Sequence, residues 1–132
     1  MADLILGQVL TFTADPFAMG PKAARHITHG AVLVEAGRIR AVGEADALKT
    51  AHPTAKITDY GRHLISAGFI DAHVHYPQTA IIASWGKRLI DWLNSYTFPE
   101  EMRFADPAYA EEVAARYLDL TLAHGTTSVC SY

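Results

Sequence analysis

Two histidines, two positions apart, are the residues of this sequence best suited to chemistry. His73 and His75 lie in an apolar run that begins at Ser66 and breaks at Pro77. Alternate side chains of a β-strand point to the same face, so Asp71, His73 and His75 are predicted to share one face. Neutral imidazole is a good ligand for zinc or iron, and a strand holds two such ligands rigidly. This spacing predicts half of a metal site. The alternative is that the two histidines are structural residues near a strand end and bind no metal.

Helical spacing follows the histidine pair. Four apolar residues recur three and four positions apart and predict a helix with one apolar stripe: Leu89, Trp92, Leu93 and Tyr96. A second helix is predicted from Asp106, a suitable N-cap before Pro107, to about residue 123, and Gly125 ends it. Its predicted apolar face is Ala110, Val113, Ala114, Tyr117 and Thr121.

Residues 126–132 are rich in β-forming side chains and predict the next strand. A strand, a helix and a strand in this order form a βαβ unit with a parallel sheet. In barrels built from such units, active sites lie at the C-terminal ends of the strands. His73 and His75 stand at that end of the first predicted strand.

Residues 1–66 have the pattern of short strands separated by turns. The sequence predicts a strand at 4–14, a loop at 15–30, a β-hairpin at 31–42 that turns at Ala36 and Gly37, a helix at 45–51, and strands at 55–59 and 63–66. Several short strands with turns between them favour part of a β-sandwich.

Composition excludes several classes of partner. The net charge is −3, and the Lys and Arg residues form no cluster, so no nucleic-acid or anionic membrane partner is expected. No stretch reaches the ~20 uninterrupted apolar residues of a membrane span. The single Cys130 allows no internal disulfide, suits a cytoplasmic protein and is predicted to be a core residue. It also excludes the zinc deaminases marked by Pro-Cys-x-x-Cys.

Three segments resemble one known family. Gly68-Phe-Ile-Asp-Ala-His-Val-His75 resembles the first barrel strand of the amidohydrolase superfamily, where Asp-x-His-x-His opens the metal site. Residues 92–101 and 124–127 resemble the guanine deaminases of that superfamily. The segment Tyr96-Thr-Phe-Pro-Glu100 is specific to this branch, whereas Gly125-Thr-Thr127 recurs across the superfamily.

The resemblance implies an α/β fold, the N-terminal part of a metal-dependent hydrolase (β/α)8 barrel with a small β-sandwich domain. Residues 1–66 would be part of the sandwich, and residues 67–132 would form the first strand, helices and second strand of the barrel. A complete barrel takes roughly 250 residues, and this chain has 132, so a truncated chain is expected.

The activity implied is that of a hydrolase acting on C–N bonds of cyclic amidines, which converts guanine to xanthine and ammonia. His73 and His75 match the metal ligands, with zinc as the expected ion and iron as the alternative. Gln78 matches the residue that binds the purine; without the resemblance it would be a solvated residue after a strand. The full-length enzyme is expected to be a cytoplasmic homodimer.

The resemblance places the rest of the catalytic machinery on later strands: a third histidine, an aspartate ligand, a further histidine near the water and the acid/base carboxylate. No catalytic residue is therefore expected within residues 1–132, and this chain alone is expected to be inactive. Two alternatives stay open. One is a related amidohydrolase that acts on another heterocycle, such as a triazine, cytosine or an adenosine-like compound. The other is a non-catalytic module.

Other candidate residues receive structural explanations. His26 and His29 are placed in a polar loop, and His124 at a helix end, where a donor complements exposed carbonyls. His52 and His63 have no evident partner in the sequence. Trp85 and the segment 96–98 are interpreted as core or interface aromatics rather than as walls of a pocket.

Overall fold

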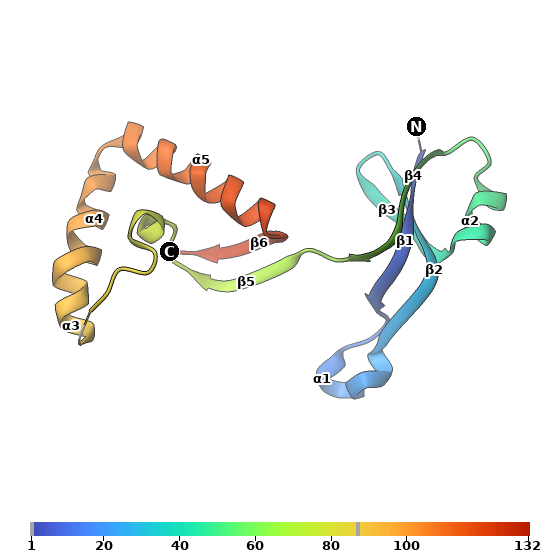
Figure 1. The fold of residues 1–132 in the computed structure, drawn as a ribbon, viewed down its shortest axis with the longest axis horizontal. Coiled ribbons are helices and arrows are strands. Elements are labelled where there is room, and N and C mark those ends of the chain that lie inside the picture. Colours follow the sequence, from blue (N-terminus) through green and yellow to red (C-terminus); the bar gives the residue numbers. More distant parts are fainter. Residues whose placement is uncertain (1, 87) are drawn as a thin grey trace. The chain divides into compact units, whose positions relative to one another are not determined.

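The computed structural model describes residues 2–86 and 88–132, which form two compact units. The first unit ends at Ala67 and the second begins at Gly68. Figure 1 shows a sheet-rich first unit and a second unit in which helices accompany two strands. Among the described residues, no helix is long and apolar enough to cross a membrane.

A four-stranded sheet forms the first unit, in the order β3-β2-β1-β4. Its strands are β1 (Ala2–Phe12), β2 (Ala24–Glu35), β3 (Arg38–Glu44) and β4 (Lys56–Ser66). Strand β1 runs antiparallel to β2 and parallel to β4. Between β1 and β2 lie α1 (Pro16–Met19) and the 3-10 helix η1 (Gly20–Ala23), and α2 (Ala45–Ala51) follows β3.

Both faces of this sheet are apolar, because residues of either parity along β1 are hydrophobic. One cluster joins Leu4 and Leu6 of β1 to residues of β2 and α2, namely Ala31, Leu33 and Ala45. A second cluster contains Val9, Ile27 and Val32, with Ile5, Val34, Val42 and Ile65 packed against it. A sandwich needs one apolar inner face on each sheet, and here α2 packs against one of the two faces. The assignment of residues 1–66 to a β-sandwich stays a prediction.

The hairpin prediction is confirmed: Glu35 pairs with Arg38, and the turn residues Ala36 and Gly37 have φ of 49° and 72°. The loop predicted at 15–30 is wrong in its second half, because β2 already begins at Ala24. Residues 24–30 are mostly polar but belong to the sheet because they pair with β1, for example Ile27 with Val9. The strands predicted at 55–59 and 63–66 form one strand, β4, which continues through Gly61 at a φ of 59°.

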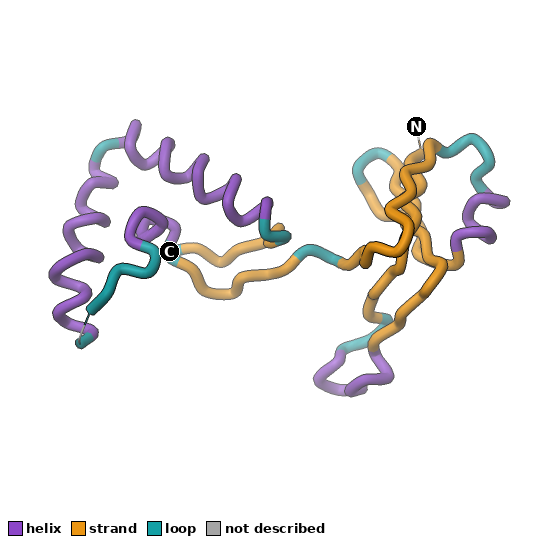
Figure 2. Tube along the Cα trace, in the orientation of Figure 1, coloured by secondary structure: helices purple, strands orange, loops and turns teal. Residues whose placement is uncertain are grey.

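The second unit is the predicted βαβ arrangement. Strand β5 (Phe69–Val74) pairs in parallel with β6 (Thr126–Ser131). The connection contains the 3-10 helix η2 (Tyr76–Ile81), α3 (Leu89–Trp92), the π-helical turn η3 (Leu93–Thr97), α4 (Phe98–Met102), the 3-10 turn η4 (Arg103–Ala105) and α5 (Pro107–Ala123). The tube in Figure 2 shows these helices in purple and the two strands in orange.

The first predicted helix is segmented into α3, η3 and α4. Pro99 has no N–H for the helical hydrogen-bond ladder, which explains a change of register just before it. Trp92, Leu93 and Tyr96 are half-buried, but Leu89 is 72% exposed. The predicted apolar stripe is therefore only partly buried in the described chain.

The second predicted helix is confirmed as α5. The Asp106 carboxylate accepts a hydrogen bond from the Ala108 N–H at 3.0 Å, as expected of an N-cap. Val113 and Tyr117 on the predicted face are buried, and Gly125 has a φ of 83° after the helix. Cys130 was expected in the core, but it is exposed, as are the other residues of β6 after Thr126; among the described residues this strand pairs with β5 alone.

Candidate metal and base-binding site

The two histidine side chains converge at the end of β5. Their Nε2 atoms lie 3.2 Å apart, and the rings meet edge to face with centroids 5.1 Å apart. The alternation of a strand accounts for this, since His73 and His75 point to the same face. Geometry therefore brings together the two residues that the sequence singles out.

The separation of the two nitrogens fits two ligands of one metal ion. Ligand nitrogens at ~2.0–2.1 Å from a tetrahedral zinc ion stand about 3.3 Å apart. The observed 3.2 Å is close to that value. No group of three or more His, Cys, Asp or Glu side chains that could hold a metal occurs in residues 2–86 and 88–132. The pair could thus supply two of the four ligands of such an ion.

Asp71 supports the strand rather than the imidazole rings. Its Oδ1 accepts a hydrogen bond from the backbone N–H of His73 at 3.1 Å. Burial, and secondly the negative charge of Asp71, raise the pKa of Tyr117 above its ordinary value. Asp71 thus contacts His73 through the backbone N–H, and its charge acts on the Tyr117 hydroxyl.

Sequence reasoning missed Tyr132 as a neighbour of the histidines. Its ring centroid lies 4.8 Å from that of His73 and 5.4 Å from that of His75, stacked on the latter. The Tyr132 N–H donates to the Val74 carbonyl at 2.9 Å, so pairing beside β5 brings it to the level of the histidines. Only the register between β5 and β6 could have revealed this contact.

A pocket of about 340 Å³ opens beside the histidine pair. Its polar lining comes from His73, His75, Gln78 and Thr79, and the rest is mainly apolar: Val74, Ile81, Ile82, Ala83, Trp92, Tyr117 and Leu120. An apolar pocket with a few polar groups is the usual form of a small-molecule site. Trp92 belongs to this pocket, whereas Trp85 lies outside it and is 72% exposed.

Gln78 lies in η2, just after the histidine pair. Its backbone N–H donates to the His75 carbonyl at 3.0 Å. Its side-chain Nε2 donates to Oε1 of Glu101, in α4, at 3.0 Å. The structure thus places Gln78 on the same pocket as both histidines and ties its carboxamide to α4.

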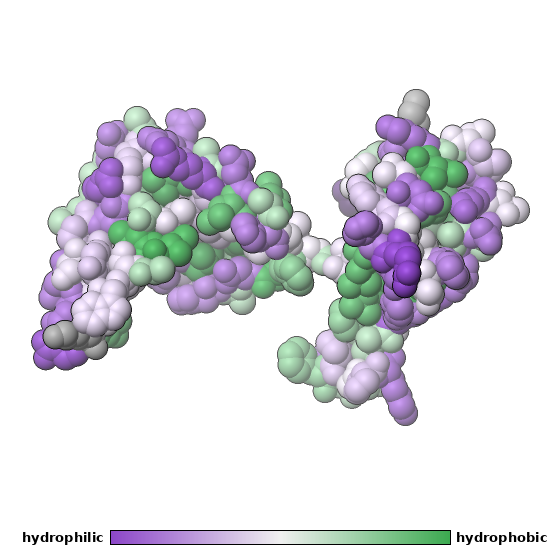
Figure 3. All heavy atoms as spheres, in the orientation of Figure 1, coloured by the Kyte–Doolittle hydropathy of each residue, from purple (hydrophilic) through white to green (hydrophobic). Residues whose placement is uncertain are grey.

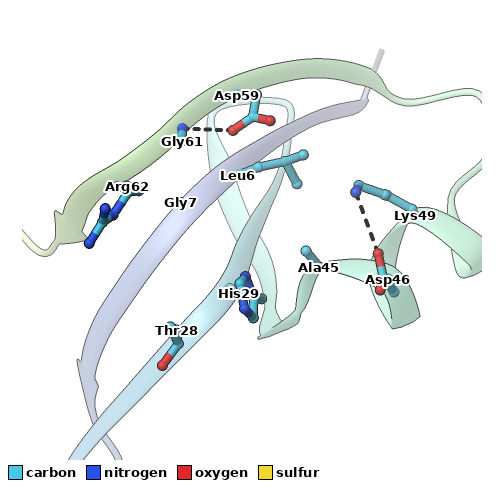
Figure 4. A pocket seen from close by; sticks show the side chains of 11 residues that line it. Leu6, Gly7, Thr28, His29, Ala45, Asp46, Lys49, Asp59, Gly61 and Arg62 are labelled. Carbon is cyan, nitrogen blue, oxygen red and sulfur yellow. Dashed lines mark hydrogen bonds and ion pairs between the residues drawn. The ribbon is translucent and has the colours of Figure 1, made fainter.

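The first unit contains a second pocket of about 340 Å³, shown in Figure 4. Three of its charged groups have local partners. Lys49 approaches Asp46 at 3.5 Å, and the Asp59 carboxylate accepts a hydrogen bond from the Gly61 N–H at 2.7 Å. It brings no pair of ligand nitrogens together among the described residues, so the histidine pocket is the stronger candidate.

Three of the remaining histidines have hydrogen-bond partners within the chain. Nε2 of His26 meets Oε1 of Gln8 at 3.1 Å, and Nδ1 of His63 meets the Tyr60 carbonyl at 2.7 Å. Nδ1 of His124 meets the Leu120 carbonyl at 2.8 Å, the role predicted for it. His26 and His29 lie in β2 rather than in a loop, near a register shift between β2 and β1.

Family models match both units. A model described as Imidazolonepropionase-like composite domain, bacteria, matches residues 30–55. A model described as Amidohydrolase family matches residues 64–132, just over half of the chain. The chain therefore belongs to the amidohydrolase family, which confirms the superfamily resemblance.

Guanine deaminases are among the most similar known proteins. The chain is 39% identical to guanine deaminase of Escherichia coli over 107 residues, which cover 80% of this chain and 24% of that protein. The crystal structure of guanine deaminase from Bradyrhizobium japonicum matches with 36% identity and a TM-score of 0.91, over 99% of this chain and 29% of that one.

Guanine deaminase from C. acetobutylicum, solved with bound guanine in its active site, matches with 27% identity and a TM-score of 0.80, over 99% of this chain and 30% of that one. These likenesses confirm the predicted fold class. The chain spans about a quarter of the length of the curated relatives that it matches.

Proposed function

We propose that the full-length protein containing this chain is a hydrolase that converts guanine to xanthine and ammonia. The observation that supports this most directly is the approach of the His73 and His75 Nε2 atoms to 3.2 Å beside a pocket that Gln78 also lines. The similarity to guanine deaminases over 80% of the chain supports the choice of substrate.

In this proposal His73 and His75 are two ligands of a zinc ion, and iron is the alternative ion. A zinc ion held by these residues would lower the pKa of a water molecule and so make a nucleophile available at neutral pH. Asp71 holds the backbone of His73 through the 3.1 Å hydrogen bond and so keeps that ligand in place. The third histidine, the aspartate ligand and the acid/base carboxylate would come from outside residues 1–132.

Gln78 is proposed to recognise the base. A carboxamide carries an acceptor and a donor side by side, and a purine edge alternates acceptors and donors in the same way. The apolar walls, which include Trp92 and Tyr117, would exclude water from the planar base. The homodimer and the cytoplasmic location rest on the resemblance and the composition alone and stay predictions.

Substrate profiling of the full-length protein tests this function. The zinc-loaded protein is assayed for ammonia release from guanine, cytosine, adenosine and an amino-triazine under identical conditions. Guanine is expected to give the highest kcat/KM. Preference for another heterocycle would overturn the proposed substrate and favour a related amidohydrolase. Absence of hydrolysis with every compound, at full zinc content, would favour a non-catalytic module.

A further inference from the structure

The carboxamide of Gln78 is held from a neighbouring helix. Its Nε2 donates to Oε1 of Glu101 at 3.0 Å, and both residues are half-buried. An ionised carboxylate can only accept hydrogen bonds, so the NH2 end of the amide must be the end that faces α4. The chemistry of Glu101 thus fixes the orientation of the Gln78 amide.

Glu101 stands on a helix that is itself anchored. The preceding Glu100 is 7% exposed and accepts hydrogen bonds from Arg103, at 2.9 Å, and from the Tyr109 hydroxyl. The Arg103 guanidinium also lies 3.8 Å from the centre of the Tyr109 ring. These contacts join α4 to the start of α5. The two adjacent acidic residues therefore have different partners: Glu100 holds α4 against the start of α5, and Glu101 accepts a hydrogen bond from η2.

We propose that Glu101 is a positioning residue that orients the Gln78 carboxamide so that its Oε1 accepts a hydrogen bond from an N–H group of the bound base. This inference rests on the proposed function for the identity of the base. With Nε2 turned to Glu101, Oε1 is the acceptor left for a ligand in the pocket that Gln78 lines. The edge of the ligand that meets Gln78 must then present a hydrogen-bond donor. This requirement selects one orientation of the planar base in the pocket over the reversed orientation.

Orientation of the amide can be measured without any substrate. The full-length protein is labelled with ¹⁵N-glutamine, and the Gln78 side-chain signal is identified by its loss in Gln78→Ala. Hydrogen exchange of that NH2 group is expected to be slow and to accelerate at least about tenfold in Glu101→Ala, because its acceptor is removed. Unchanged exchange would overturn the inference whether or not guanine is the substrate.

Kinetics then test whether the orientation matters for binding. Glu101→Ala is expected to raise KM for guanine about 3- to 10-fold with kcat nearly unchanged. Glu101→Gln is expected to raise it by about twofold only, because the new amide can hold Gln78 in either orientation and about half of the molecules stay competent. Glu112→Gln, which alters an exposed acid paired with Arg116, is the matched control and should leave KM unchanged.

A double-mutant cycle separates positioning from direct contact. If Glu101 acts through Gln78, adding Glu101→Ala to Gln78→Ala changes KM by less than about 1.5-fold. If Glu101→Ala raised KM as much in the Gln78→Ala background as in the unaltered protein, the inference would be overturned. Glu101 would then bind substrate or support the fold independently of Gln78. Zinc content is expected to be equal in all variants. If the unaltered protein does not act on guanine, the proposed function fails, and amide exchange still decides the role of Glu101.

Discussion

At the scale of single residues, the spacing of His73 and His75 has the most direct chemical consequence. Each histidine alone would be an ordinary polar side chain near a strand end. At the end of β5 their Nε2 atoms lie 3.2 Å apart, the separation expected of two ligands that share an ion. Single substitutions at these histidines can therefore test metal binding separately from the other functions of the site.

Replacing either histidine by alanine in the full-length protein is expected to remove most bound zinc and nearly all turnover. The reason is that each change deletes one ligand of a proposed four-ligand ion. Metal analysis after dialysis and an assay with added zinc check this. Asp71→Asn should be milder, because its contact is with the His73 backbone. Full zinc content in the double alanine variant would exclude this metal site.

Tyr109 gives a prediction about pH. Its hydrogen bond to Glu100, together with burial and that negative charge, raises the pKa of Tyr109 above its ordinary value. The protonated Tyr109 hydroxyl therefore stabilises the folded state. Because its folded-state pKa is raised, this stabilisation is fully present below the ordinary tyrosine pKa of about 10 and is lost as the pH rises through the folded-state pKa.

Tyr109→Phe is expected to lower the Tm of the full-length protein at neutral pH. The difference from the unaltered protein should shrink as the pH rises above about 10. Thermal unfolding at several pH values measures it. A difference that does not change with pH would mean that the hydroxyl contributes nothing through its proton.

At the scale of elements, the site depends on a few turns that fix where helices end and strands begin. Gly125 ends the turn after α5 with a φ of 83°, and its carbonyl accepts a hydrogen bond from the Phe69 N–H at 2.8 Å. This contact aligns the starts of β5 and β6. The alignment in turn sets which residues lie beside the histidines.

Gly125→Ala is therefore expected to destabilise the full-length protein by about 1–2 kcal/mol, the cost of a left-handed conformation for a residue with a Cβ. The added Cβ would stand 3.4 Å from Phe69, an ordinary contact, so backbone strain is the main effect. Gly125→Asn is the control and should cost less, since asparagine tolerates this region. Chemical denaturation measures both, and equal losses would point to crowding rather than strain.

At the scale of the whole molecule, much apolar surface is exposed in residues 1–132. Phe69 and Ile70 on β5 are 66% and 75% exposed, and Leu122 on α5 is 60% exposed. Figure 3 shows hydrophobic patches in green on both units. A two-stranded sheet is marginally stable by itself in water. Exposed patches of this kind favour aggregation.

Residues 1–132 expressed alone are accordingly expected to be inactive and to have little stable tertiary structure. Hydrogen exchange across 69–75 and a guanine assay test this. Strong protection there would show that the second unit folds independently. Zinc-dependent turnover by the 132 residues would show that the catalytic set lies elsewhere than the resemblance implies.

The sequence by itself determined the parts that depend on local chemistry. Asp106 and Pro107 predicted the start of α5, Ala36 and Gly37 predicted the hairpin, and alternation in β5 predicted that His73 and His75 share a face. Caps, turns and strand alternation depend on neighbouring residues, so the sequence contains them.

Only the tertiary structure decided the contacts between distant segments. The start of β2 at Ala24 depends on pairing with β1, and the position of Tyr132 depends on the register of β6 against β5. The hydrogen bond between Gln78 and Glu101 joins residues of two separate helices. Such contacts follow from packing and register, which no local pattern contains, and for that reason the positioning of Gln78 emerged only from the folded chain.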